Sequence, residues 1–125
     1  MLLRSLNAFF LGDYRESPES YRIMDSIKGA QGLFFQCPKC SAGKIKSNDE
    51  ETGRPYYINA HGILCWFTNP VGADFVPQTV SPNPGRWLIS GSSLDDLSFI
   101  GPENSTIYAS GECRWSGHLV RGSIH

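Results

Sequence analysis

The sequence predicts a small β-dominant fold, either all-β or β-rich α+β, arranged as an antiparallel sheet or sandwich with a zinc-knuckle turn. Three observations lead to this prediction. The 125 residues include 13 Gly and 8 Pro, a composition typical of tight turns. Short apolar runs rich in aromatic and β-branched residues alternate with turn residues along the chain. A Cys-x-x-Cys motif at 37–40 follows one of these runs directly.

The first third of the chain divides into short elements. Residues 1–11 are apolar and predict a strand or a short helix joined to the core, whereas the polar residues 13–20 predict a loop. A short strand is expected at 21–24, followed by a capped helical turn over 25–30. The compact apolar run at 32–36 predicts a buried strand that leads into the cysteine motif.

The remaining elements are expected to be strands joined by polar connections. The polar segment 41–54 predicts a mobile loop, and the Pro-rich segment 69–85 predicts a long connection outside any central strand. Further strands are expected at 56–58, 62–68, 86–90, 97–100, 106–110 and 119–124. A chain of this length has the size of one domain, so we expect a single zinc-stabilised β-rich domain over residues 1–125.

The charge balance argues against some classes of partner. The chain has 11 basic and 12 acidic residues and a net charge of −1, which gives no general attraction to nucleic acid or to anionic membranes. Arg4 and Asn7 interrupt the apolar N-terminal run, so a signal peptide is not expected. No run approaches the roughly 20 apolar residues of a membrane helix. We therefore expect a cytoplasmic location, where cysteines are more often thiols or metal ligands than disulfides.

The motif Cys37-Pro38-Lys39-Cys40 has three interpretations. Two thiolates on one tight turn suit a tetrahedral zinc ion with Zn–S distances of about 2.3 Å. A redox-active pair would instead require a helix that starts at the first cysteine within a thioredoxin-like βαβ unit. Here the motif follows a predicted strand, and residues 41–43 resemble a turn, which favours the metal. Unligated thiols are the third interpretation.

Two further ligands would come from the pool His61, Cys65, Cys113, His118 and His125. Cys113 follows a turn and would form a second knuckle-like corner. His61 and Cys65 would lie about 13 Å apart on an extended strand, so at most one of them is expected to be a ligand. The plain alternatives are a buried core thiol for Cys65, a turn residue for His61 and a frayed terminus for His125.

Four segments carry a resemblance to a known family. They are AQG-[apolar]-F-x-CPKC at 30–40, H-x-x-x-CWF at 61–67, PGRW-x-x-x-G-x-S-x-x-DL at 84–97 and C-x-W-x-G at 113–117. In this order they resemble a family of small uncharacterised bacteriophage and prophage proteins with a CPxC, a histidine before an apolar strand and a C-x-W-H corner. The resemblance covers most of residues 28–122.

The resemblance implies a metal site made of Cys37, Cys40, His61 and Cys113. The sequence departs from the family pattern at the last corner, where Ser116 stands in place of the histidine. Two ligands from that corner would therefore require His118. The family carries no activity that can be transferred to this chain.

Catalytic motifs are absent from the sequence. There is no HExxH, no H-x-E before the cysteine pair, no GxSxG, no P-loop and no GxGxxG. A catalytic site would require the fold to bring together Asp95, Asp96 and His118. The plain interpretation of residues 95–96 is a turn or a helix cap. The aromatic residues predict core packing, with Trp87 as the candidate for an exposed binding anchor.

The resemblance implies a phage-type protein, and with the absence of a catalytic motif we expect a non-enzymatic protein-binding factor with one structural Zn²⁺. A host-takeover or anti-defence inhibitor in the host cytoplasm is the first expectation, with a host or phage protein as its partner. A structural component of the phage particle is the alternative. A small zinc-dependent hydrolase is the third hypothesis, and it would need three protein ligands and an open coordination position.

Overall fold

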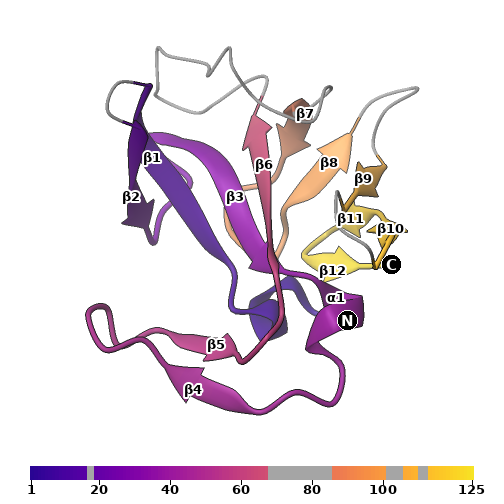
Figure 1. Ribbon diagram of the computed structural model, residues 1–125. Helices are drawn as coiled ribbons and strands as arrows, with labels where there is room; N and C mark the ends of the chain where they lie inside the picture. The colour runs from indigo at the N-terminus through magenta and orange to yellow at the C-terminus, as the bar shows by residue number, and fades with distance from the viewer. Residues whose placement is uncertain (17–18, 68–85, 101–105, 110–112) are drawn as a thin grey trace.

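A computed structural model describes residues 1–16, 19–67, 86–100, 106–109 and 113–125. Its centre is a six-stranded sheet in the order β2-β1-β3-β6-β7-β8, accompanied by three two-stranded sheets (Figure 1). The strands of the large sheet are β1 (Phe9–Glu16), β2 (Glu19–Met24), β3 (Ala30–Gln36), β6 (Gly62–Phe67), β7 (Arg86–Ser90) and β8 (Ser98–Ile100). The short elements are η1 (Leu3–Leu6), α1 (Pro38–Ser41), β4 (Lys46–Asn48), β5 (Pro55–Tyr57), β9 (Ile107–Tyr108), β10 (Ser116–Gly117), β11 (Leu119–Val120) and β12 (Ser123–Ile124). The predicted β-dominant fold class is confirmed.

One pairing in the large sheet differs from the antiparallel arrangement that we expected. β1, β2, β3 and β6 pair antiparallel with their neighbours, as do β7 and β8. β6 and β7, however, pair in parallel through Trp66 with Arg86 and Phe67 with Trp87. Parallel neighbours require a long crossover, and the chain between β6 and β7 has the length for one. The Pro-rich segment 69–85 lies outside the described residues.

Two predictions for the N-terminal third are wrong. The expected loop at 13–20 is largely strand, because β1 continues to Glu16 and β2 starts at Glu19. Ladder hydrogen bonds join backbone groups, so polar side chains do not prevent a hairpin, and this one contains a register shift between Gly12 and Arg15. The expected helical turn at 25–30 is absent: residues 25–29 form bends and a turn, and Ala30 already starts β3.

The core lies on one face of the large sheet. Ile63, Cys65 and Phe67 alternate inward along β6, as period-2 spacing predicts. Trp87 is also buried and stacks on Phe99 with ring centroids 5.4 Å apart, so the hypothesis of an exposed anchor at Trp87 is wrong. The core also contains Leu3, Leu6, Phe10, Leu33, Phe35, Leu97, Ile107 and Leu119.

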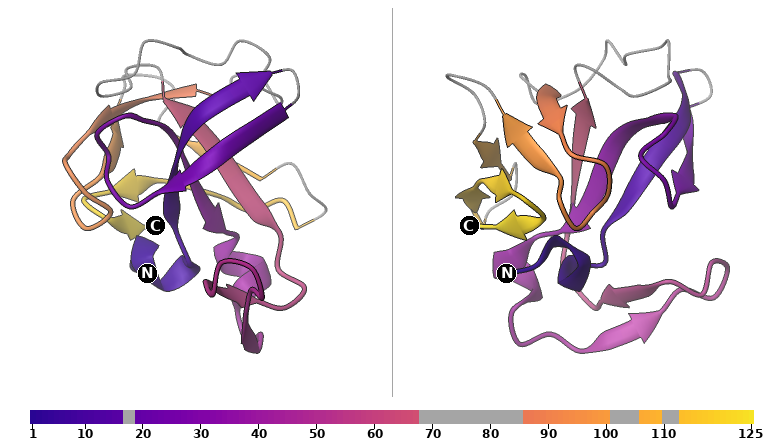
Figure 2. Two further views of the ribbon diagram at one scale, coloured as in Figure 1. Left: turned by 90° about the vertical axis from the view of Figure 1, so that its left-hand side faces the viewer. Right: turned by 180° about the vertical axis from the view of Figure 1, so that it is seen from behind.

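Residues 42–60 form a hairpin, which we call the arm, that projects below the large sheet (Figures 1 and 2). It contains β4 and β5, which pair antiparallel, so the expected loop at 41–54 is partly strand. Its turn is fixed by Asp49, whose Oδ1 accepts hydrogen bonds from the N–H groups of Glu51 and Thr52, both at 2.9 Å. These bonds lower the pKa of Asp49.

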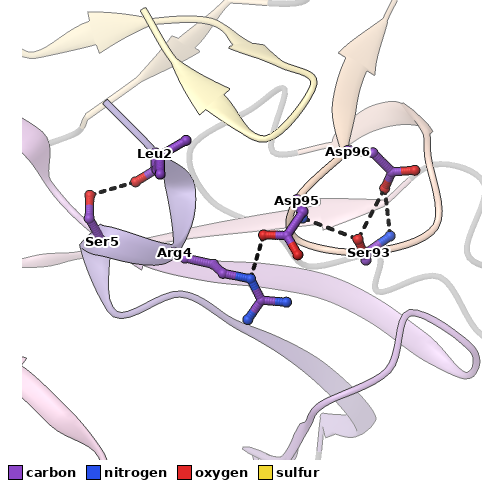
Figure 3. Close-up of polar contacts among 6 residues, drawn as sticks. All are labelled: Leu2, Arg4, Ser5, Ser93, Asp95 and Asp96. Carbon is purple, nitrogen blue, oxygen red and sulfur yellow. Dashed lines mark hydrogen bonds and ion pairs between the residues drawn. The ribbon is translucent and has the colours of Figure 1, made fainter.

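The first residues of the chain pair with its last ones. The amide of Leu3 donates to the carbonyl of Gly122 at 2.8 Å, and the amide of Ile124 donates to the carbonyl of Met1 at 2.7 Å. Beside this contact the guanidinium of Arg4 pairs with Asp95 (Figure 3). Neither helix in the described ranges is long and apolar enough to cross a membrane.

Residues 92–96 form a turn, as the plain interpretation of Asp95 and Asp96 predicted. The Oδ1 atom of Asp96 accepts hydrogen bonds from the amides of Ser92 at 2.8 Å and Ser93 at 2.7 Å. These two backbone bonds lower the pKa of Asp96. Its carboxylate therefore serves the local backbone.

Candidate metal centre

Four side chains from distant parts of the chain converge beside α1. The ligand atoms of Cys37, Cys40, His61 and Cys113 all lie within 4.8 Å of one another. Cys37 lies between β3 and α1, Cys40 lies in α1, His61 precedes β6, and Cys113 lies between β9 and β10. Three thiol sulfurs and one imidazole form a donor set that fits a transition-metal ion.

The Cys-x-x-Cys turn is shaped by its own backbone. Pro38 occupies the first position of α1, where a missing N–H costs nothing, and the amide of Ser41 donates to the carbonyl of Cys37 at 2.9 Å. The amides of Lys39 and Cys40 donate to the sulfur of Cys37. These donors stabilise a thiolate at the base of the site.

The surroundings of this turn do not match a thioredoxin-like unit. The helix after Cys37 is a single turn of four residues. β3, the strand that leads into the motif, pairs antiparallel with β6 from Gly32 with Trp66 to Gln36 with Gly62. The next strand in sequence, β4, pairs antiparallel with β5 in a separate sheet. A βαβ crossover joins parallel strands, so this arrangement favours metal binding over a redox-active pair.

The antiparallel ladder brings His61 to the cysteines. The amide of Cys37 donates to the carbonyl of His61 at 3.0 Å, which continues the register of β3 and β6. The Nδ1 atom of His61 lies 3.4 Å from the carbonyl oxygen of Gly62, and its Nε2 lies 3.1 Å from the sulfur of Cys113. A proton on Nδ1 is therefore directed to a carbonyl, while Nε2 faces the cluster as a ligand would.

Cys113 completes the cluster from the C-terminal region. Its sulfur lies 3.7 Å from the sulfur of Cys37, and its carbonyl accepts a hydrogen bond of 2.7 Å from Nζ of Lys39. The contact with Lys39 fixes the backbone of Cys113 against α1. This lysine was not singled out in the sequence, where nothing links it to a residue 74 positions away.

The thiols of Cys37 and Cys113 have different pKa values because their surroundings differ. Burial raises the pKa of Cys37 to about 11, despite the backbone amides that oppose this shift. The backbone amide of Trp115, followed by the side chain of His61, lowers the pKa of Cys113 to about 6. An ion would therefore meet Cys113 as a thiolate and would displace the proton of Cys37.

The other candidates from the sequence lie elsewhere. Cys65 is fully buried in the core, and burial raises the pKa of its thiol. His118 is exposed, and its backbone pairs with that of His125. None of these three belongs to the cluster of ligand atoms. Cys65 is therefore a core residue, as its plain interpretation predicted.

Gln36 is a supporting residue that the sequence did not reveal. Its Oε1 accepts hydrogen bonds from Nδ2 of Asn7 and the amide of Tyr57, both at 2.7 Å. Its Nε2 donates to the carbonyls of Tyr57 and Ala60, both at 3.0 Å. This buried amide thereby fastens the end of the arm next to His61. In the sequence, the only indication of this role is that Gln36 is a polar residue at the end of the apolar run 32–36.

Comparisons with known proteins add no relative. No family model matches the chain, and neither a curated protein nor a solved structure matches it. The resemblance to small phage proteins therefore stays a prediction.

Proposed function

We propose that Cys37, Cys40, His61 and Cys113 bind one zinc ion as a closed structural centre, and that the chain is a non-enzymatic protein-binding domain. The observation that carries the proposal is the convergence of four protein ligand atoms within 4.8 Å. Four protein ligands fill a tetrahedral zinc site, whereas a catalytic site keeps one position for water or substrate.

The distances support zinc as the ion. In a tetrahedral site with Zn–S bonds of about 2.3 Å, two sulfurs lie about 3.8 Å apart. The sulfurs of Cys37 and Cys113 lie 3.7 Å apart, so this pair requires almost no movement to hold the ion. The Nδ1 contact of His61 with the Gly62 carbonyl supplies the outer hydrogen bond typical of a zinc-bound histidine.

A structural ion would tie Cys113, which lies outside the large sheet, to the end of that sheet where the β3–β6 ladder already brings His61 next to Cys37. Cys37 and Cys113 are 76 positions apart, so the ion closes a long loop and restricts the unfolded chain. It also holds both ends of the arm, since Cys40 and His61 flank residues 42–60. If the metal only stabilises the fold, the function must depend on the surface of the domain. This supports a role in binding a partner, either a host protein or a component of a phage particle.

Elemental analysis and a thiol titration on protein purified without chelators test this proposal. We expect about one zinc per chain, with the ligand thiols protected until the protein is denatured. Replacement of zinc by cobalt(II) would give the absorption of a tetrahedral thiolate centre, which counts the sulfur ligands directly. Protein that contains no metal and shows three reactive thiols while folded would overturn the structural centre. A five-coordinate or water-bearing cobalt spectrum would favour the hydrolase hypothesis.

A further inference from the structure

A cleft separates the arm from the large sheet. Its volume is about 190 Å³. The sheet contributes Phe9, Phe34 and Ile23 to its lining, and the arm contributes Arg54, Pro55 and Tyr56. In Figure 1 the arm runs below β1 and β3. The lining residues of the two walls therefore belong to different elements. The cleft is distinct from the cluster of cysteines, because none of the four candidate ligands lines it.

The floor of the cleft is aromatic and partly exposed. The rings of Phe9 and Phe34 stack with centroids 4.6 Å apart and an interplanar angle of 17°. Neither residue is fully buried, although both belong to the central strands β1 and β3. The exposed side chain of Tyr56 forms part of the facing wall. Such an apolar pocket with polar groups at its edge is typical of a binding site.

The polar groups of the cleft are largely engaged already. Gln36 uses both ends of its amide on Asn7, Tyr57 and Ala60. Arg54 lies over the ring of Phe9 and pairs with Asp25 at 2.8 Å. A charged group entering the cleft would have to displace one of these contacts, so the interior suits a neutral apolar group.

The charge at the tip of the arm indicates which residues of the partner would lie next to the apolar group in the cleft. Asp49, Glu50 and Glu51 are consecutive and exposed, and they stand at the turn that carries one cleft wall. Asp49 and Arg54 both line the cleft, and Arg54 pairs with Asp25. In the part of the chain that the structure describes, no ion pair involves Asp49, Glu50 or Glu51, so the tip presents negative charge to whatever enters. Charge complementarity selects a basic residue beside the apolar group.

We propose that this cleft receives one large apolar side chain, best an aromatic one, from a partner protein segment that carries Lys or Arg beside it. The volume fits a single large side chain and is below the roughly 300 Å³ at which sites for drug-sized ligands begin. Aromatic anchors in a pocket with charged neighbours at the rim are the usual centre of a protein interface.

The position of the arm depends on the metal centre. Cys40 and His61 bracket the arm, and Gln36 holds its second end through Tyr57 and Ala60. An ion bound by both Cys40 and His61 would fix the distance between the arm and the sheet. The inference rests on the proposed zinc centre for this coupling alone, since the lining of the cleft is independent of the metal.

The test is a titration of zinc-loaded, isotope-labelled protein followed by NMR, with blocked tripeptides Lys-Trp-Lys, Lys-Ala-Lys and Glu-Trp-Glu as probes. We expect Lys-Trp-Lys to give saturable shifts at Phe9, Phe34 and Tyr56. We expect Lys-Ala-Lys to bind about tenfold more weakly, since it lacks the anchor. Glu-Trp-Glu should be several-fold weaker at low salt and should approach Lys-Trp-Lys at high salt.

A matched pair of variants locates the binding. Tyr56→Ser should weaken Lys-Trp-Lys about fivefold, whereas Tyr108→Ser, which changes an exposed tyrosine of β9, should not affect it. Lys-Trp-Lys shifts that are absent, do not saturate or are unchanged in folded Tyr56→Ser would overturn the cleft proposal. Tighter binding of Glu-Trp-Glu would overturn the assignment of a basic neighbour.

A metal assay on the same samples separates this proposal from the preceding one. Protein with one zinc per chain that does not bind Lys-Trp-Lys overturns the cleft and leaves the zinc centre intact. Folded protein without metal that binds the probe with full affinity overturns the coupling and the zinc centre, while the cleft stands.

Discussion

The sulfur of Cys113 lies 3.7 Å from that of Cys37, although 76 positions separate the two residues in sequence. The antiparallel register of β3 with β6 brings His61 next to these two cysteines. The cluster therefore depends on contacts between the central sheet, α1 and the C-terminal region.

Replacing Cys113 with Ser should remove the metal and destabilise the protein. Loss of one ligand leaves an incomplete site, and metal-binding free energy contributes directly to folding. We expect a loss of roughly 2–4 kcal/mol, which lowers the melting temperature by roughly 10 °C. Elemental analysis and thermal unfolding measure both effects.

Cys65→Ala is the matched control, because it removes a sulfur from the core and not from the cluster. It should keep one zinc per chain and lose about 1–2 kcal/mol through the small cavity. Metal retention in Cys113→Ser together with metal loss in Cys65→Ala would contradict the assignment of ligands.

Gln36→Leu should loosen the arm. The substitution removes a buried amide that makes four hydrogen bonds, and it leaves the amide of Tyr57 without its acceptor. Each unsatisfied buried group costs about 1–3 kcal/mol. Hydrogen exchange should accelerate at Tyr57 while the exchange of β1 amides changes little.

Tyr57→Phe serves as the comparison for Gln36→Leu. It removes only the exposed hydrogen bond from the Tyr57 hydroxyl to the carbonyl of Ser5. The expected loss is below about 1 kcal/mol. Equal exchange rates in both variants would show that Gln36 does not hold the arm.

Gly122→Ala should be far more costly than Gly53→Ala. Both glycines have positive φ angles, +75° at Gly122 and +71° at Gly53, so both substitutions carry the strain of a left-handed backbone. A Cβ at Gly122 would also lie 2.3 Å from the carbonyl oxygen of Asp95, whereas one at Gly53 meets nothing within 4 Å.

We expect about 1 kcal/mol for Gly53→Ala, since only the backbone strain applies there. Gly122→Ala should cost at least twice as much, because a backbone carbonyl cannot move aside easily. Denaturant unfolding of the two variants measures the difference. Equal losses would mean that the turn at 121–122 adapts without disturbing its contact with Asp95.

Asp96→Asn should destabilise the protein in a manner that depends on pH. The amides of Ser92 and Ser93 hold the pKa of Asp96 below its ordinary value of 3.8. A lowered folded-state pKa gives stability that is present above the ordinary value and is lost as pH falls through the folded value. The variant should therefore differ from wild type at pH 7 and converge with it at pH values below the lowered pKa.

Unfolding midpoints measured from pH 7 down to pH 2 test this dependence. Asp95→Asn is the control, because Asp95 forms an exposed ion pair with Arg4, which contributes little. A constant difference between wild type and Asp96→Asn over this range would contradict the role of the carboxylate.

The sequence by itself determined the β-dominant class and several individual strands. Apolar runs such as 32–36 and 62–68 supply buried side chains wherever they pair, and the observed β3 and β6 contain most of both. The CPKC turn could also be recognised, because two cysteines and a proline at that spacing constrain a local backbone. The polar side chains at 13–20 and 41–54 led to the prediction of loops, but both segments contain strands. Strand pairing uses backbone groups, which polar residues also have.

Only the tertiary structure decided which distant residues meet. The family resemblance implied His61 and Cys113 as partners of the CPKC turn, but residue type and local spacing alone left Cys65 and His118 equally eligible. The register of β3 with β6 turns Cys65 into the core and sets His61 beside Cys37, while the fold of the C-terminal region brings Cys113 to both. The parallel pairing of β6 with β7 and the cleft between the arm and the large sheet arise in the same way. They depend on long-range contacts, whose energies are set by how whole elements pack and not by the residues adjacent in sequence.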